Sequence, residues 1–188
     1  LVFTGDMLGA VMSQSGIADF SATELSKQLT GKNARASISV GDYEHALNAG
    51  GSPKDIETIL QLVYLNFTAP RFDQTDLDNL KKMYIPYFGN MESDPNYICS
   101  KELQKTLYGN HARRQITSAA QIEALNIPTL QSVHSKLFGY ADDFRFVIVG
   151  NVDLNTLKPL VEKYIGSLPT SKKVEYAVVD DGVRMAKG

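Results

Sequence analysis

The stretch ARASISVGDYEHALNAGG (34–51) decides the fold class, because the hydrophobic pattern changes its period there. Its first half alternates apolar and polar residues, which is typical of a β-strand with one buried face. Gly41-Asp42 then provides a tight turn into a second strand around residues 43–47. Two strands joined this tightly predict an antiparallel hairpin.

Helical patterns lie on both sides of this hairpin. In the helix at 21–30, Ser21 and Glu24 have the spacing of a capping box, and Gly31 ends the helix. Pro86 is expected to end or kink the helix that begins at Asp73. The predicted helices cover 6–15, 21–30, 52–69, 73–86, 94–109, 118–125, 128–138 and 153–166.

A third strand is predicted in DFRFVIVGNVD (143–153), whose apolar centre is typical of a central strand. Few strands and many helices give an α+β fold, with an antiparallel sheet and helices packed mainly on one face. Three strands make a thin sheet for so many helices, so we expect the first strand or strands of this sheet to lie ahead of Leu1.

Length and composition indicate one globular domain. The 188 residues are 43% hydrophobic, which is enough for a single core, and we assign the domain to residues 1–169. Residues 170–188 are interpreted as a linker toward a following domain, so we expect a piece of a longer protein. The net charge of −2 and the absence of a Lys/Arg run do not favour nucleic acid. Apolar runs such as 146–150 are too short for membrane insertion.

The single cysteine, Cys99, excludes an internal disulfide and any site with several cysteine ligands. We interpret it as a small side chain that is buried or half-buried, rather than as a reactive thiol.

No two of the three histidines have the helical spacing of a zinc pair. His45 is expected to be structural or exposed, and His134 to lie on a solvated helix face. His111 with Arg113 and Arg114 is the one arrangement suited to an anion or a peptide carboxylate, although a solvated basic loop explains it too. No serine or cysteine nucleophile motif occurs either, so the residues predict a domain without its own catalytic centre.

Four stretches in succession carry a resemblance that covers the chain from about Met7 to Pro169. Together they resemble the pitrilysin/insulinase-type zinc metallopeptidases, and more narrowly the catalytically inactive domain in the C-terminal half of bacterial zinc proteases. The resemblance implies a mitochondrial-processing-peptidase-like architecture. The stretches are SGIADFSATELSKQLTGK (15–32), GGSPKDIETILQLVYLNFTAPRFD (50–73), LYGNHARRQIT (107–117) and FRFVIVGNVDLNTLKPLVEKYIGSLP (144–169).

Active members of that family carry an H-x-x-E-H signature on a helix that ends in a glycine. If that glycine corresponds to Gly16, then Met7 and Val11 stand where the two zinc-binding histidines belong, and Ala10 replaces the glutamate. The third ligand, a glutamate, would fall at Tyr87, with Glu92 close enough for a shifted register. The signature is therefore degenerate at each position, and this chain is expected to bind no metal.

The resemblance implies a non-catalytic domain of a zinc-dependent metalloendopeptidase, which supports peptide binding and closes the proteolytic chamber. Zinc is then expected in the active half, in the same protein or in a partner subunit. His111, Arg113 and Arg114 are the candidate substrate contacts. A pure assembly module that pairs with a separate active subunit is the alternative, and an autonomous enzyme is the third reading. Bacterial relatives of this kind favour the periplasm.

Overall fold

The computed structural model describes residues 2–171 and 180–186, so residues 172–179 and 187–188 of the predicted linker lie outside the described residues. The elements of the described part are α1 (Val2–Ser15), α2 (Ala22–Gln28), β1 (Ala34–Val40), β2 (His45–Gly51), the 3₁₀ turn η1 (Pro53–Asp55), α3 (Ile56–Thr68), α4 (Gln74–Met91), α5 (Pro95–Tyr108), the 3₁₀ turn η2 (Ala112–Arg114), α6 (Ala119–Glu123), α7 (Ile127–Phe138) and α8 (Leu154–Tyr164).

The predicted antiparallel hairpin is confirmed. β1 pairs with β2 in a register that runs from Ala34 opposite Gly51 to Val40 opposite His45. The side chain of Ile38 is 6% exposed, whereas its neighbours Ser37 and Ser39 are exposed, as the alternating pattern predicts. The second strand begins later than expected, because residues 41–44 form the turn and the Gly41 amide donates to the Glu44 carbonyl at 2.8 Å.

The predicted third strand at 143–153 is wrong. In the described part of the chain the sheet has two strands, and residues 144–150 have no strand assignment. Strand geometry requires a hydrogen-bonded neighbour, and a groove separates residues 144–150 from β2. The apolar sequence is suited to a strand, but the partner that would complete one is not among the described residues.

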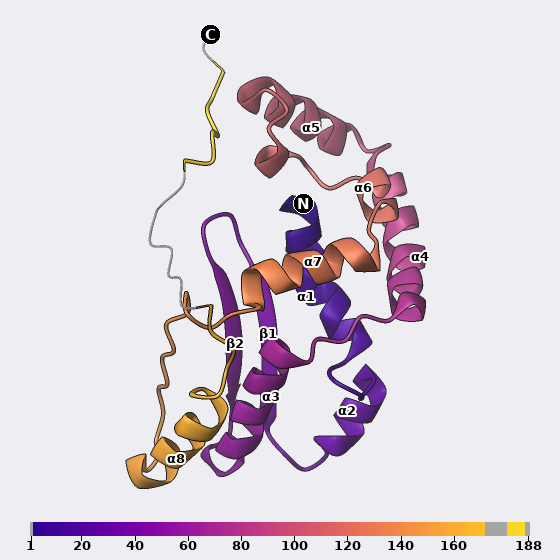
Figure 1. The fold of residues 1–188 in the computed structure, drawn as a ribbon. Helices are drawn as coiled ribbons and strands as arrows, with labels where there is room; N and C mark the ends of the chain where they lie inside the picture. Colours follow the sequence, from indigo (N-terminus) through magenta and orange to yellow (C-terminus); the bar gives the residue numbers. More distant parts are fainter. Residues whose placement is uncertain (1, 172–179, 187–188) are drawn as a thin grey trace.

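Helices cover the hairpin mainly from one side, so the α+β class is confirmed (Figure 1). α1 and α3 both pack against β1, and α7 packs against α1. The approach of α1 is very close at Gly9, where an added Cβ would lie 2.5 Å from the Ile38 carbonyl oxygen. A glycine there allows the helix backbone to lie directly on the strand.

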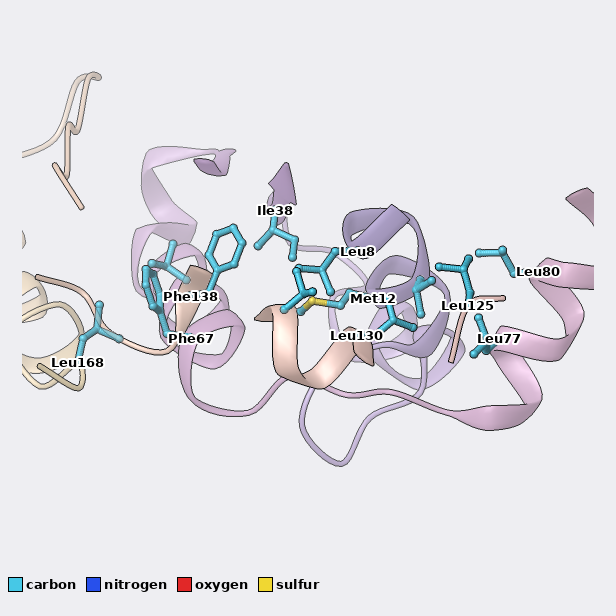
Figure 2. Close-up of a cluster of buried hydrophobic side chains, with 13 residues drawn as sticks. Leu8, Met12, Ile38, Phe67, Leu77, Leu80, Leu125, Leu130, Phe138 and Leu168 are labelled. Carbon is cyan, nitrogen blue, oxygen red and sulfur yellow. The ribbon is translucent and has the colours of Figure 1, made fainter. Parts of the chain in front are cut away.

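One hydrophobic core joins α1, the hairpin, α3, α4 and α7 (Figure 2). Leu8, Leu77, Leu130 and Phe138 are each 0% exposed. Leu168, beyond α8, is 5% exposed in the same core, so the chain returns to the core near the end of the predicted domain.

Most helix ends follow the predicted capping signals. The Ser21 hydroxyl accepts from the Glu24 amide, and the Glu24 carboxylate accepts from the Ser21 amide, so the capping box is confirmed. Pro86 does not end its helix, since α4 continues to Met91. Proline removes the hydrogen bond to the carbonyl four residues earlier, but Lys82 and Pro86 are both exposed, so water can satisfy that carbonyl.

Two side chains differ from expectation in their exposure. His134, predicted to lie on a solvated face, is 2% exposed, and its Nε2 lies 2.8 Å from the Asn66 carbonyl oxygen, to which it donates. Its ring also stacks on Phe138. Cys99, predicted to be at least half-buried, is exposed on α5. Polar neighbours in sequence misled both predictions, because burial depends on which face of the helix meets the core.

We expect the protein to lose stability as the pH falls below about 6.5, the ordinary pKa of histidine. Burial lowers the pKa of His134, against the hydrogen bond to Asn66, and burial likewise lowers the pKa of His45. The unfolded chain then binds protons that the folded chain does not, so stability is fully present above the unfolded pKa and declines below it. Urea midpoints at pH 7.5, 6.5 and 5.5 measure this slope.

His134→Gln is the matched control, because its amide can donate to the Asn66 carbonyl but does not titrate. We expect a smaller slope in this variant, with a remainder from His45. A slope that is unchanged between the two proteins would contradict the assignment to His134.

Candidate functional site

The degenerate signature positions lie on α1, where they form part of the core. Val11 is 1% exposed, and Met7 and Ala10 are half-buried and packed against the core cluster. α1 lies against β1, α4 and α7, so its apolar face is covered on several sides. This helix face therefore serves packing, which a pair of metal-binding imidazoles at positions 7 and 11 would disrupt.

The candidate positions for a third ligand are also unsuited to a metal. Tyr87 is 56% exposed on α4 and its ring contacts Phe88 edge to face. The Glu92 carboxylate accepts from the Ala119 amide at 3.1 Å, at the first residue of α6. If the alignment is shifted so that Glu92 becomes the third-ligand position, its carboxylate is already hydrogen-bonded to the N-terminus of α6.

Across residues 2–171 and 180–186, no three histidine, cysteine, aspartate or glutamate side chains are placed to hold a metal ion. The residues that are present at the signature positions do not fit zinc, because thioether, methyl, isopropyl and phenol groups replace the imidazole and carboxylate ligands that zinc prefers. These four positions therefore do not form a zinc site.

The three predicted substrate contacts, His111, Arg113 and Arg114, form the basic cluster, which lies in and beside η2. Both arginines bind the hairpin turn. The Arg114 guanidinium lies 3.1 Å from the Asp42 carboxylate, and Arg113 Nη1 donates to the Asp42 carbonyl at 2.7 Å. The structure thus brings the cluster together with a turn that lies 71 residues earlier.

The basic cluster also binds the described segment 180–186. The Arg113 Nε lies 3.9 Å from the Asp181 carboxylate, and the His111 Nε2 donates to the Asp181 carbonyl at 3.1 Å. The His111 Nδ1 accepts from the Arg113 amide at 3.3 Å, so the two bonds together select the neutral tautomer that carries its proton on Nε2. The His111 side chain thereby contacts both η2 and the segment 180–186.

Charges in this region are closely balanced. Burial raises the pKa of Asp6, repulsion by Asp42 raises it further, and Arg113 opposes both effects. Within residues 2–171 and 180–186, the buried Arg114 Nε and one buried Asp181 carboxylate oxygen have no hydrogen-bond partner. Each arginine already faces an aspartate, so an incoming peptide carboxylate would compete with Asp42 and Asp181.

The second candidate site is a groove of about 760 Å³ between β2 and residues 144–150. The first two turns of α3 form its floor, with Ile56, Ile59 and Leu60 among the lining residues. Sequence reasoning missed this groove, because it placed residues 144–150 inside the sheet. The apolar run at residues 144–150 was the sequence signal that could have indicated the groove, because an apolar strand needs neighbouring segments on both of its edges.

No helix in the described part of the chain is both long and apolar enough to cross a bilayer. Among the described residues, the first candidate site is a set of ion pairs and the second is a groove with many apolar lining residues, and both are suited to binding.

The family comparison matches residues 124–184 to the family described as Peptidase M16 inactive domain. The probable zinc protease PqqL of Haemophilus influenzae is 18% identical over 169 residues, which cover 90% of this chain and 18% of that protein. This chain therefore spans less than a fifth of the length of that relative.

Solved structures share the fold. The periplasmic protease PqqL from Escherichia coli has a TM-score of 0.80 and 20% identity, over 97% of this chain and 20% of that one. A peptidase M16 inactive domain from Pseudomonas fluorescens has a TM-score of 0.58 and 20% identity, over 70% of this chain and 33% of that one.

Proposed function

We propose that this chain is a non-catalytic domain of a zinc-dependent metalloendopeptidase. Two findings support this: residues 124–184 match the family described as Peptidase M16 inactive domain, and the fold is similar to that of the periplasmic protease PqqL. In this role it supports peptide binding and helps to close the chamber in which another domain cleaves the peptide. The alternative is an assembly module that pairs with a separate active subunit and does not touch the substrate.

The main observation that supports the proposal is that one face of α1 is buried in the core. The face that would hold zinc in an active relative is occupied here by Met7, Ala10 and Val11, which pack against the core. Conversion to an active site would require both new ligands and a new core. The zinc is therefore assigned to an active half, in the same polypeptide or in a partner subunit, and the similarity to a periplasmic protease supports a bacterial periplasmic location.

We place the peptide contact at the basic cluster. The Arg114 Nε is a buried donor without a hydrogen-bond partner, and a peptide carbonyl or carboxylate could accept from it. Exchange of Asp42 or Asp181 for a substrate carboxylate would keep the charge balance of the cluster nearly constant. This is an argument for binding and orientation, and it assigns no chemical step to these side chains.

Residues 1–188 alone are expected to cleave no unstructured peptide in the presence of zinc, whereas the intact polypeptide with an active half cleaves it. Calorimetry should show no stoichiometric zinc binding tighter than about 1 μM, roughly −8 kcal/mol. Metal-dependent cleavage by residues 1–188 that survives repurification would contradict the proposal.

The Arg114→Gln variant of the intact protein separates peptide binding from pure assembly. If Arg114 contacts the peptide, we expect KM to rise about 10-fold, or ~1.4 kcal/mol, with kcat little changed. Arg71→Gln is the matched control. Arg71 forms a comparable ion pair, in which its Nη2 lies 3.0 Å from the Asp73 carboxylate, and this pair is not part of the basic cluster. Equal kinetics in both variants would favour the assembly module.

A further inference from the structure

Residues 180–186, named the acidic segment below, lie against the basic cluster in the manner of a bound peptide. The His111 Nε2 donates to the Asp181 carbonyl at 3.1 Å, and the Arg113 Nε lies 3.9 Å from the Asp181 carboxylate. The cluster therefore contacts both the backbone and the acidic side chain of one residue. A backbone contact combined with a side-chain contact is the arrangement by which a protein binds a peptide and also selects its sequence.

The conformation of the acidic segment turns the Asp181 carboxylate toward the cluster. One carboxylate oxygen, Oδ1, accepts from the Val183 amide at 3.0 Å, and the other oxygen faces Arg113. Gly182 has a φ of +75°, in the left-handed region that favours glycine, and an added Cβ there would lie 3.9 Å from the His111 Nε2. An aspartate followed by a glycine thus lets the chain turn beside His111 while the carboxylate faces the arginine.

The contact between Arg113 and Asp181 is longer than a direct hydrogen bond. Charge-assisted hydrogen bonds between nitrogen and oxygen are about 2.7–2.9 Å long, so the 3.9 Å pair is an ion pair alone. In the part of the chain that the structure describes, the Asp181 Oδ2 has no hydrogen-bond partner, although this side chain is only 14% exposed. The carboxylate of a free peptide that reaches the guanidinium directly would therefore bind more strongly than Asp181 does.

The other aspartate beside the basic cluster has a different role. Asp42 lies in the turn between β1 and β2, where its carboxylate is 3.1 Å from the Arg114 guanidinium and its carbonyl accepts from Arg113 Nη1 at 2.7 Å. These contacts are shorter than the one to Asp181, and they hold both arginines on the hairpin. Asp42 therefore positions the cluster, whereas Asp181 is the group that a ligand would replace.

We propose that the basic cluster selects acidic peptides, with an aspartate followed by a glycine as the preferred pattern, and that the acidic segment is an internal competitor for this site. The inference rests on the proposed function, because it names the class of peptide that the domain binds. A segment of the same chain has an effective concentration on the order of millimolar, so a free peptide must exceed this concentration or bind more tightly. Peptide binding then releases the acidic segment, and no covalent step is involved.

Fluorescence anisotropy of the intact protein with the labelled peptide DDGVRMA, which has the sequence of residues 180–186, tests the proposal. We expect the Asp181→Asn protein to bind this peptide about 10-fold more tightly than the wild type, because its own segment competes less. Asp180→Asn is the matched control. It removes the same charge next to Asp181, but Asp180 pairs with Arg184 inside the segment, where both side chains are exposed, so the affinity should change by less than about 2-fold.

Two further variants connect the affinity to the ion pair. A peptide that carries the Asp181→Asn change should bind about 10-fold more weakly than DDGVRMA, because an amide does not pair with the guanidinium. Arg113→Gln combined with Asp181→Asn in the protein should remove this preference for the acid over the amide. Thermal unfolding of each variant checks that it is folded. If the Asp181→Asn protein does not fold, the wild type at millimolar peptide must still prefer the acid.

Several results would overturn the proposal. Equal affinity for the acid and amide peptides would mean that the cluster does not select a carboxylate. An equal gain in the Asp180→Asn and Asp181→Asn proteins would mean that net charge, and not release of the segment, explains the effect. Because the assay measures binding and not cleavage, acid-selective binding by an intact protein that cleaves no peptide would contradict the proposed function alone. Cleavage without any preference for acidic peptides would contradict this inference alone.

Discussion

Val11→His is expected to lower the free energy of unfolding by about 2–6 kcal/mol. Val11 is 1% exposed within the core that α1 forms with β1, α4 and α7. The larger imidazole overpacks the site at a cost of about 1–3 kcal/mol, and a buried polar group without a partner adds about 1–3 kcal/mol. Urea unfolding of residues 1–188 followed by circular dichroism measures the change.

Met7→His is the matched control at the other signature histidine position. Met7 is half-buried at the edge of the core, so its replacement is expected to cost less than about 1.5 kcal/mol. The two changes combined with Ala10→Glu restore the H-x-x-E-H letters, yet we expect no gain of stability on addition of zinc, because position 11 faces the core. A Val11→His variant of unchanged stability, or a triple variant that zinc stabilises, would contradict the packing role of α1.

Phe138→Ala is expected to lower the free energy of unfolding by about 3–5 kcal/mol. Phe138 is 0% exposed, and its ring contacts those of His45, Phe67 and Phe144 at centroid distances of 5.2, 6.3 and 5.6 Å. Removal of this ring opens a cavity where α7, the hairpin and α3 meet. Denaturant unfolding at pH 7.5, above the ordinary pKa of histidine, separates this effect from the titration of His45 and His134.

Phe146→Ala serves as the control in the same group of rings. Phe146 contacts Phe67 and Phe144 but is 39% exposed, so its truncation is expected to cost less than about 1.5 kcal/mol. Equal losses for the two variants would mean that Phe138 is not the centre of the cluster.

Local sequence signals were sufficient wherever the interaction partners are neighbours in the chain. The capping box at Ser21 and Glu24 and the proline and glycine that bound α5 were legible because each satisfies backbone groups within a few residues. The alternation in β1 predicted its buried face for the same reason. Pro86 was the exception, since solvent around α4 tolerates a proline that an interior helix would not.

The candidate sites were less predictable, because they depend on residues far apart in sequence. The grouping of His111, Arg113 and Arg114 was visible, but their pairing with Asp42 and Asp181 was not. The apolar run at 144–150 suggested a strand, but whether a strand forms depends on a neighbour that the hydrophobic pattern cannot supply.

By itself, the sequence determined the hairpin, most of the helices and their caps, and the absence of histidine and acidic side chains at residues 7, 10, 11 and 87, because these are matters of local chemistry and of which side chains exist. The tertiary structure alone decided that Val11 and His134 lie in the core, that the basic cluster faces two aspartates, and that a groove separates β2 from residues 144–150. The burial of a side chain and the pairing of charges depend on surfaces that come into contact only after the chain has folded, so they cannot be predicted from a short stretch of sequence.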